Sequence, residues 1–335
     1  MTEPVSNPVP DAGDGDQMFA AAMRLVADRP PLADVQHAVA LLEQSLAQGY
    51  ALADERLAAF HAMAANGSGD LRHWGQAFDA LQRTAELGSA AAGKQLLLLA
   101  DNSSEPVIPA DVRPEFWQDV RSRIRVERLI ASPGRKSLSD TPRIRMVEGF
   151  ATPAECQWVI DAAYVHLAPA TVFDHDTGGL VLDPARNNSA VSLMFEQMDV
   201  ISEILRTRIS AATRVPVRAF EPPQILRYEV GQEFVPHHDF MDENSRGFRE
   251  ELAGHGQRIA TFLIYLNDDF EGGETVFPKV GVRCRGRTGD AIFWANLDTA
   301  GRPDPLTMHA GLPPTSGEKW VFSQWIRERA APPGS

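Results

Sequence analysis

Hydrophobic residues change their spacing along the chain. Between about residues 17 and 100, alanine and leucine recur every three or four positions, which predicts amphipathic helices. From about Ile225 onward, short runs of β-branched and aromatic residues are separated by turn residues. That pattern predicts many short strands in a sandwich or barrel. The sequence therefore predicts an α+β protein in which a small helical domain precedes a β domain.

The helical region contains an internal repeat. Residues 38–60 align with residues 77–99, and Gly49 and Gly88 fall at equivalent places. Each unit reads as a helix, a glycine stop and a second helix, the pattern of an α-solenoid hairpin. It resembles Sel1-like repeats, which are relatives of the tetratricopeptide repeats. The repeats are interpreted either as a scaffold that binds protein or peptide, or as a cap that covers the neighbouring domain.

Changes in composition divide the chain into segments. Residues 1–16 are acidic and rich in Pro and Gly, so they are expected to form a disordered tail. The helical repeats follow over 17–100, and a Pro-broken linker with one helix is expected over 101–142. The β domain is expected over 143–330, and residues 331–335 form a short tail.

Several local elements can also be placed. One helix is expected over 115–131, and alternation predicts a strand over 143–147. Thr152 and Glu155 have the spacing of a capping box, with proline at the first helical position, so a helix is predicted to begin there. The polar stretch 241–256 is interpreted as a lid over a binding site or as a plain surface excursion.

The overall charge limits the classes of partner. A formal net charge of −13 at pH 7 argues against a nucleic-acid partner and against an anionic membrane surface. No apolar run approaches the roughly 20 residues that a membrane-spanning helix needs. The N-terminus also lacks the basic-then-apolar layout of a signal peptide. The protein is therefore expected to be cytoplasmic.

Cysteine and lysine are both scarce. Cys156 and Cys284 lie far apart, so no disulfide framework is implied and reduced, buried thiols are expected. Arginine is abundant, and this bias, with the many alanines, is typical of a GC-rich bacterial genome. The lysines are Lys94, Lys136, Lys279 and Lys319.

The segment "FVPHHDF" (234–240) contains candidate metal ligands. Side chains of a strand alternate between two faces, so His237 and Asp239 point the same way and His238 points the other way. If a metal is bound here, geometry selects His237 with Asp239 and leaves His238 out. A single His-x-Asp pair is nevertheless a weak signal.

A third candidate ligand strengthens the metal hypothesis. His309 lies 70 residues after Asp239 and just before a β run, and Lys319 follows ten residues later. Two histidines and one carboxylate on one face of a metal leave open positions, as in non-haem Fe(II) oxygenases. A 2-oxo acid would take two of these positions and O₂ the third. A cation at the far end of the pocket, such as Lys319, would pair with the distal carboxylate.

Ordered motifs extend this pattern over much of the chain. They are "QILRYEVGQEFVPHHDF", "RIATFLIYLND", "EGGETVFP", "GDAIFWAN", "MHAG" and "GEKWVFSQWIRE". From about residue 144 to 329 the chain resembles prolyl 4-hydroxylases, which are Fe(II)/2-oxoglutarate-dependent dioxygenases. The resemblance implies a double-stranded β-helix, or jelly roll, with helices packed on one sheet. It also implies Fe(II), 2-oxoglutarate and O₂ as requirements, with ascorbate as a stimulant.

The resemblance implies a role for individual residues. Iron would be held by His237, Asp239 and His309. The C5 carboxylate of 2-oxoglutarate would be gripped by Lys319 with help from Thr261. The residues that would contact a peptide substrate are Tyr228, Arg186 and Trp325.

Two departures from the family pattern bear on the co-substrate and the substrate. Phe234 occupies a position where relatives usually have a tyrosine whose hydroxyl helps to hold the co-substrate. The peptide-contacting segment reads "RNNSAV" where relatives have Arg-Thr-Ser. These differences leave the iron ligands unaffected.

The leading functional hypothesis is hydroxylation of an unactivated C–H bond, first of all in a prolyl residue of a peptide or protein, with succinate and CO₂ as co-products. The substrate would be docked by the N-terminal repeats. An alternative is hydroxylation of a free amino acid or small metabolite. From a different class, the chain could be a repeat-based interaction protein with a vestigial oxygenase domain, although the intact triad and Lys319 argue against this. Asp239 argues against a halogenase, because halogenases of this class lack the carboxylate ligand.

Overall fold

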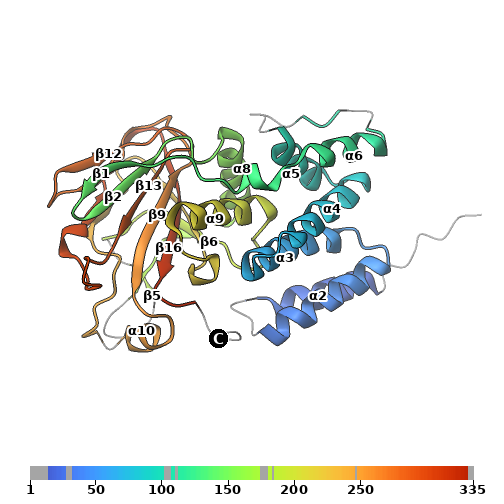
Figure 1. Cartoon of the computed structure of the whole chain (residues 1–335), viewed down its shortest axis with the longest axis horizontal. Helices are drawn as coiled ribbons and strands as arrows, with labels where there is room; N and C mark the ends of the chain where they lie inside the picture. The colour runs from blue at the N-terminus through green and yellow to red at the C-terminus, as the bar shows by residue number, and fades with distance from the viewer. Residues whose placement is uncertain are drawn as a thin grey trace, which may run out of the picture.

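The N-terminal part of the computed structural model is entirely helical (Figure 1). The structure describes residues 14–27, 32–101, 107–109, 112–173, 180–182, 185–245 and 247–330. Most of the expected tail at 1–16, and all of 331–335, lie outside these residues, and the first helix already begins at Gly15. The N-terminal helices are α1 (Gly15–Leu25), α2 (Leu32–Ala47), α3 (Leu52–Ser68), α4 (Arg72–Glu86), α5 (Ala90–Asp101), α6 (Pro114–Arg123) and α7 (Val126–Leu129).

The internal repeat corresponds to two helical hairpins. Helices α2 and α3 are joined at Gly49, and helices α4 and α5 are joined at Gly88. Both glycines have positive φ angles, 86° and 97° respectively, a conformation that strains other residues. The predicted order of helix, glycine stop and helix is therefore confirmed. Assignment to the Sel1-like family stays a prediction.

One sequence expectation was wrong in detail. The single helix expected over 115–131 is divided into α6 and α7, because the backbone is extended at Ile124 (φ −67°, ψ 126°). This conformation places the Ile124 side chain in the core between the helices, where it is 6% exposed. Helical periodicity alone did not predict the break, because the break depends on packing of Ile124 against helices that are distant in the sequence.

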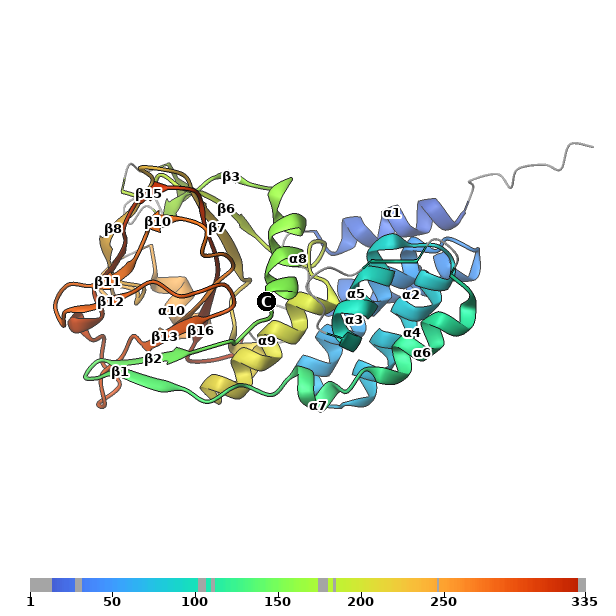
Figure 2. The same ribbon diagram turned by 90° about the horizontal axis from the view of Figure 1, so that it is seen from above.

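The C-terminal part consists mainly of two antiparallel sheets that curve towards each other (Figure 2). The larger has eight strands in the order β1-β2-β13-β9-β16-β7-β6-β3, and the smaller has four in the order β12-β11-β14-β8. The larger sheet is formed by β1 (Lys136–Asp140), β2 (Arg143–Val147), β3 (Ala168–Pro169), β6 (Ser189–Ser192), β7 (Gln224–Tyr228), β9 (Arg258–Tyr265), β13 (Ala291–Ala295) and β16 (Lys319–Arg327). The smaller is formed by β8 (Phe234–His237), β11 (Thr275–Phe277), β12 (Val282–Cys284) and β14 (His309–Gly311).

Short elements complete the C-terminal part. Two further strand pairs are β4 (Val172–Phe173) with β5 (Leu180–Val181), and β10 (Glu271–Gly272) with β15 (Pro314–Ser316). The helices are α8 (Pro153–Tyr164), α9 (Val200–Thr213), α10 (Arg249–His255), η1 (Val217–Ala219) and η2 (Pro305–Thr307). Helices first and antiparallel sheets after them confirm the predicted α+β organisation.

Helix α8 begins as the sequence predicted. The Thr152 hydroxyl accepts a hydrogen bond from the Glu155 amide at 3.2 Å, and the Glu155 carboxylate accepts one from the Thr152 amide at 2.8 Å. The same carboxylate forms a buried ion pair at 2.8 Å with Arg208 of α9. The capping box therefore also ties α8 to α9.

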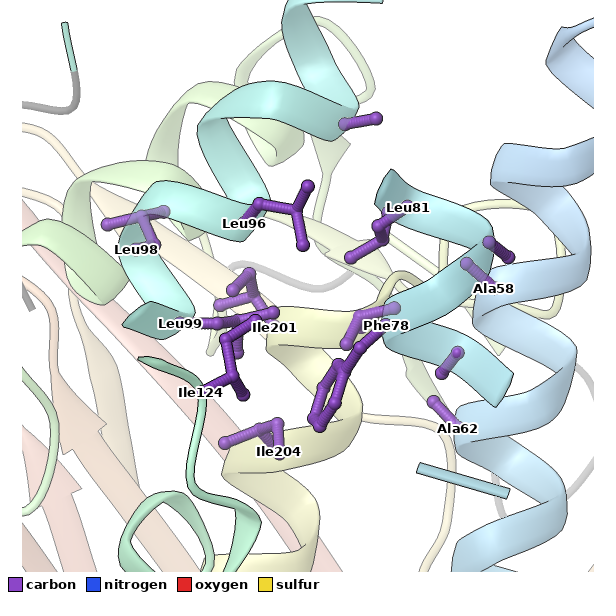
Figure 3. Close-up of a cluster of buried hydrophobic side chains, with 14 of the residues drawn as sticks. Ala58, Ala62, Phe78, Leu81, Leu96, Leu98, Leu99, Ile124, Ile201 and Ile204 are labelled. Carbon is purple, nitrogen blue, oxygen red and sulfur yellow. The ribbon is translucent and has the colours of Figure 1, made fainter. Parts of the chain in front are cut away.

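Helix α9 joins the helical part to the sheets. Ile201 and Ile204 lie in a hydrophobic cluster with Phe78 and Leu99 of the N-terminal helices (Figure 3). The next residue, Leu205, lies in the cluster that covers the larger sheet. A fully buried isoleucine contributes about 1.5–3 kcal/mol, so this shared core attaches the N-terminal helices firmly. The N-terminal helices thus pack directly against α9.

Among the described helices, none has both the length and the apolar character required to cross a membrane.

Candidate metal centre

Three side chains converge between the two sheets. His237 ends β8 and is paired across the smaller sheet with His309, which begins β14. Asp239 follows two residues after His237. Asp239 Oδ1 lies 3.8 Å from His237 Nε2, and Asp239 Oδ2 lies 3.4 Å from His309 Nε2. One ligand atom from each residue lies within 4.8 Å of the others, a spacing that fits one metal ion.

Backbone carbonyl groups orient both imidazole rings. His237 Nδ1 lies 2.8 Å from the Val235 carbonyl oxygen, and His309 Nδ1 lies 3.0 Å from that of Thr307. Donation from Nδ1–H leaves the Nε2 lone pair of each ring directed at Asp239. Such outer contacts are how proteins fix the tautomer and orientation of metal-binding histidines.

Burial sets the protonation state that metal binding requires. Burial, followed by the nearby His309, lowers the pKa of His237 to about 3. Burial likewise lowers the pKa of His309. Burial alone would raise the pKa of Asp239, but His309, His237 and Thr261 together lower it below its ordinary value. At neutral pH the site therefore presents two neutral imidazoles and one carboxylate, the donor set that suits Fe(II).

His238 lies outside this cluster. Its Nε2 atom is 3.2 Å from the Pro305 carbonyl oxygen, and its ring packs near Phe240. The structure thus brings together the three residues that strand alternation and the family motif selected, and it separates the fourth. Strand β8 ends at His237, so Asp239 reaches the site from the residues just beyond the strand.

Lys319 stands at the start of β16, paired with Tyr228 of β7. It lines the same pocket as the three ligands and is 2% exposed. Its Nζ atom lies 5.3 Å from the Tyr228 ring centroid and 5.8 Å from that of Tyr265. Among the described residues Lys319 has no carboxylate partner, and burial lowers its pKa to about 8. A buried, unpaired ammonium is costly, so the site is complementary to a ligand carboxylate.

Thr261 is engaged with the metal ligands. Its hydroxyl donates a hydrogen bond of 2.7 Å to Asp239 Oδ2 and accepts one of 3.1 Å from Asn296 Nδ2. Both Thr261 and Asn296 are almost fully buried. Thr261 lines the same pocket as Lys319, but its hydroxyl holds Asp239, a contact that the sequence did not reveal.

The residues expected to contact a peptide also line this pocket. Arg186 is 6% exposed and donates to the Gln224 side chain at 3.0 Å. Tyr228 is buried, and burial raises its pKa to about 12. Trp325 lies under the guanidinium of Arg258, whose Cζ is 3.7 Å from the ring centroid. All three expected contacts are therefore gathered around the triad.

Phe234 occupies the position of the family tyrosine. Its ring stacks on His237, with centroids 3.5 Å apart and planes at 15°. Arg186 lies on it as well, with its Cζ 5.1 Å from the ring centroid. The ring therefore supports a metal ligand through packing alone.

Sequence reasoning missed several pocket residues. Alternate residues of β16 face the pocket. Once Lys319 is placed in the pocket, strand periodicity therefore predicts that Ser323 lines it as well. Thr275 also lines the pocket and its hydroxyl is 3.0 Å from that of Tyr265. No local sequence signal distinguishes Asn296, because this residue lies just beyond β13 and contacts Thr261 of β9, which is 35 residues away in the sequence.

Comparisons with known proteins agree with this site. Residues 223–327, which include the triad and Lys319, match the 2OG-Fe(II) oxygenase superfamily. Prolyl 4-hydroxylase 1 of Arabidopsis thaliana is 35% identical over 207 residues, which span 58% of this chain and 71% of that protein. Prolyl 4-hydroxylase subunit alpha-1 of Rattus norvegicus is 38% identical over 190 residues, 57% of this chain but only 35% of the subunit. A solved viral collagen prolyl hydroxylase from Paramecium bursaria Chlorella virus-1 is 27% identical, with a TM-score of 0.43, over 57% of this chain and 98% of its own.

The fold and the site thus define an Fe(II)- and 2-oxoglutarate-dependent dioxygenase that uses O₂. Within that class, the chain belongs to the prolyl 4-hydroxylase-like family.

Proposed function

We propose that this enzyme hydroxylates a prolyl residue in a peptide or protein and releases succinate and CO₂. The observation that carries the proposal is the shared pocket of the triad, the buried Lys319 and the aromatic residue Trp325. The related prolyl 4-hydroxylases support proline as the first choice of residue. We also assign the two facing sheets to a double-stranded β-helix.

The chain's own residues bind and position the reactants. His237, Asp239 and His309 would hold Fe(II), which together with 2-oxoglutarate and O₂ supplies the oxidising chemistry. The Lys319 ammonium would bind the distal carboxylate of 2-oxoglutarate and so fix its orientation. Trp294 packs edge-on against His309, with ring centroids 4.5 Å apart, and is fully buried, so it keeps water away from this side of the His309 ring.

We further propose that the N-terminal repeats contribute to substrate docking and that the enzyme acts in a bacterial cytoplasm on a polypeptide, not on nucleic acid or at a membrane. The formal charge of −13 supports the expectation about nucleic acid. The repeats pack against α9, which in turn packs on the larger sheet, and this supports a role close to the catalytic part.

Mass spectrometry of a peptide library treated with the iron-loaded enzyme tests the function. Peptides heavier by one oxygen atom at proline are the expected result, and an Asp239→Ala protein provides the control. Hydroxylation only of free amino acids or small metabolites would overturn the assignment to a polypeptide. An absence of any 2-oxoglutarate decarboxylation would favour a vestigial oxygenase domain.

A further inference from the structure

A large cleft lies between the N-terminal helices and the sheets. Its volume is about 760 Å³, within the range of roughly 300–1,000 Å³ that is usual for ligand sites. Helices α2 and α3 form one wall, and α10, the segment 217–223 and the end of β16 form the other. The iron ligands do not line it, so the cleft is a separate feature of the molecule.

The surface of the cleft is mainly apolar. Phe60 and Met63 of α3 line it, as do Met194, Phe195 and Phe220, and the rings of Phe60 and Phe195 stack with centroids 6.4 Å apart. Methionine side chains are flexible and adapt to the shape of a bound partner. Backbone groups of the second wall are already paired, as in the 2.8 Å hydrogen bond from the Leu193 amide to the Pro223 carbonyl. An occupant would therefore be held by side-chain contacts and not by adding a strand.

The charges that line the cleft favour an anionic occupant. Each lining glutamate is already in an ion pair: Glu203 with Arg206, Glu221 with Arg258 and Arg327, and Glu251 with Arg327. By contrast, Arg218 and Arg329 also line the cleft and have no carboxylate partner among the described residues. In a chain with a net charge of −13, this leaves a local excess of positive charge.

The cleft begins where the iron pocket ends. Trp325 lines the iron pocket, and Arg327, two residues further along β16, lines the cleft. Two residues along a strand advance about 7 Å. The two sites also share a chain of contacts, because Arg258 lies 3.7 Å from the Trp325 ring and 2.7 Å from Glu221 in the cleft wall. One extended chain could thus occupy both.

We propose that the cleft binds an apolar segment of the polypeptide substrate that carries carboxylates, while the residue to be hydroxylated lies in the iron pocket. The identity of the bound chain as substrate rests on the proposed function. The continuity along β16 selects this occupant, together with Arg218 and Arg329, which have no carboxylate partner in the part of the chain that the structure describes. The substrate class is therefore an extended acidic and hydrophobic chain.

Binding is tested first, without turnover. The probe is a fluorescent, proline-free peptide, Leu-Glu-Leu-Phe-Glu-Leu, and its binding to the full-length protein is followed by anisotropy. The Arg218→Ala/Arg329→Ala protein is expected to bind at least about fivefold more weakly, as loss of two exposed charge contacts implies. A peptide with Gln in place of Glu should bind to the unaltered protein more weakly by a similar factor. Ala64→Trp, which adds bulk to the α3 wall, should abolish binding.

Catalysis is tested second, with a peptide that carries one proline in a Gly-Ser chain. Extension of this peptide by the same acidic segment is expected to lower KM at least about fivefold with kcat unchanged. The double arginine variant should remove the difference in KM between the two peptides. Arg72→Ala, an arginine 89% exposed outside the cleft, is the matched control and should preserve the difference.

The outcomes separate this inference from the proposed function. Failure of the acidic probe to bind, or equal binding to Ala64→Trp, would overturn the cleft assignment. Equal KM for the two proline peptides would overturn it as well, while their hydroxylation would uphold the proposed function. Cleft-dependent binding without hydroxylation of any proline would support the cleft site and count against prolyl hydroxylation.

Discussion

The iron pocket and the cleft beside the helices are built in opposite ways. In the iron pocket the polar groups are buried and held by specific hydrogen bonds, as in the contact of Thr261 with Asp239. In the cleft the surface is mainly apolar and includes methionines, and Arg218 is exposed among its lining residues. Chemistry requires charges fixed in position before the reactants arrive, whereas recognition of a chain requires area and adaptable contacts. The comparison implies that single polar changes matter far more in the first site than in the second.

Removal of a metal ligand should have the largest effect. His237→Ala is expected to abolish 2-oxoglutarate turnover, because two donors hold the metal much less well than three. His238→Ala should retain most activity, since His238 lies outside the ligand cluster. Succinate formation by folded protein, verified by circular dichroism, is the measurement. Equal losses in the two variants would contradict the assignment of ligands.

Removal of the hydrogen bond from Thr261 to the metal ligand Asp239 should have the next largest effect. Thr261→Val deletes the hydroxyl that holds Asp239 and should weaken Fe(II) binding by about 10–100-fold. Calorimetric titration with Fe(II) under anaerobic conditions measures this, and Thr315→Val, at an exposed threonine, serves as the control. A raised KM for 2-oxoglutarate with unchanged iron affinity would instead give Thr261 the co-substrate role implied by the family resemblance.

Lys319→Ala should weaken the binding of 2-oxoglutarate by at least about tenfold. A charge-assisted hydrogen bond contributes about 1.5–3 kcal/mol, and the distal carboxylate would also be left buried and unpaired. Lys279→Ala removes an exposed lysine and provides the matched control. The KM for 2-oxoglutarate at saturating iron is the measurement. An unchanged KM would show that another residue holds this carboxylate.

The lowered pKa of Lys319 predicts opposite pH effects on affinity and stability. Only the ammonium form binds a carboxylate, so the affinity for 2-oxoglutarate should fall as pH rises through about 8. Burial of the Lys319 ammonium destabilises the folded state. This cost is complete below pH 8, where Lys319 is protonated in both the folded and the unfolded protein. This cost is relieved between about 8 and the ordinary value of 10.5, so folding stability should rise there. Binding and melting curves over this range, compared with Lys319→Ala, test both signs.

The smallest expected effect is a gain. Phe234→Tyr would add a hydroxyl beside the ligands, and one new hydrogen bond to 2-oxoglutarate should tighten its binding by about 0.5–1.5 kcal/mol. The stacking of Phe234 on His237 should persist, because the ring is retained. The ratio of the dissociation constants of the two proteins for 2-oxoglutarate measures the gain. Weaker binding would mean that the packed ring has no room for the hydroxyl.

The fold shows where sequence patterns carry enough information. The capping box at Thr152, the glycine turns at Gly49 and Gly88, and the main strands followed from local spacing, since each depends on neighbouring residues. The break at Ile124 did not, because it depends on burial against helices that are distant in the sequence.

The sequence by itself determined the iron centre of this protein more fully than its surroundings. His237, Asp239, His309 and Lys319 could be selected because strand alternation and ordered motifs restrict which residue types can stand there. Only the tertiary structure revealed that Asn296 supports Thr261, and that the cleft opens two residues beyond Trp325. The physical reason is that these features arise from side chains far apart in the chain, whose contacts depend on how helices and sheets pack together.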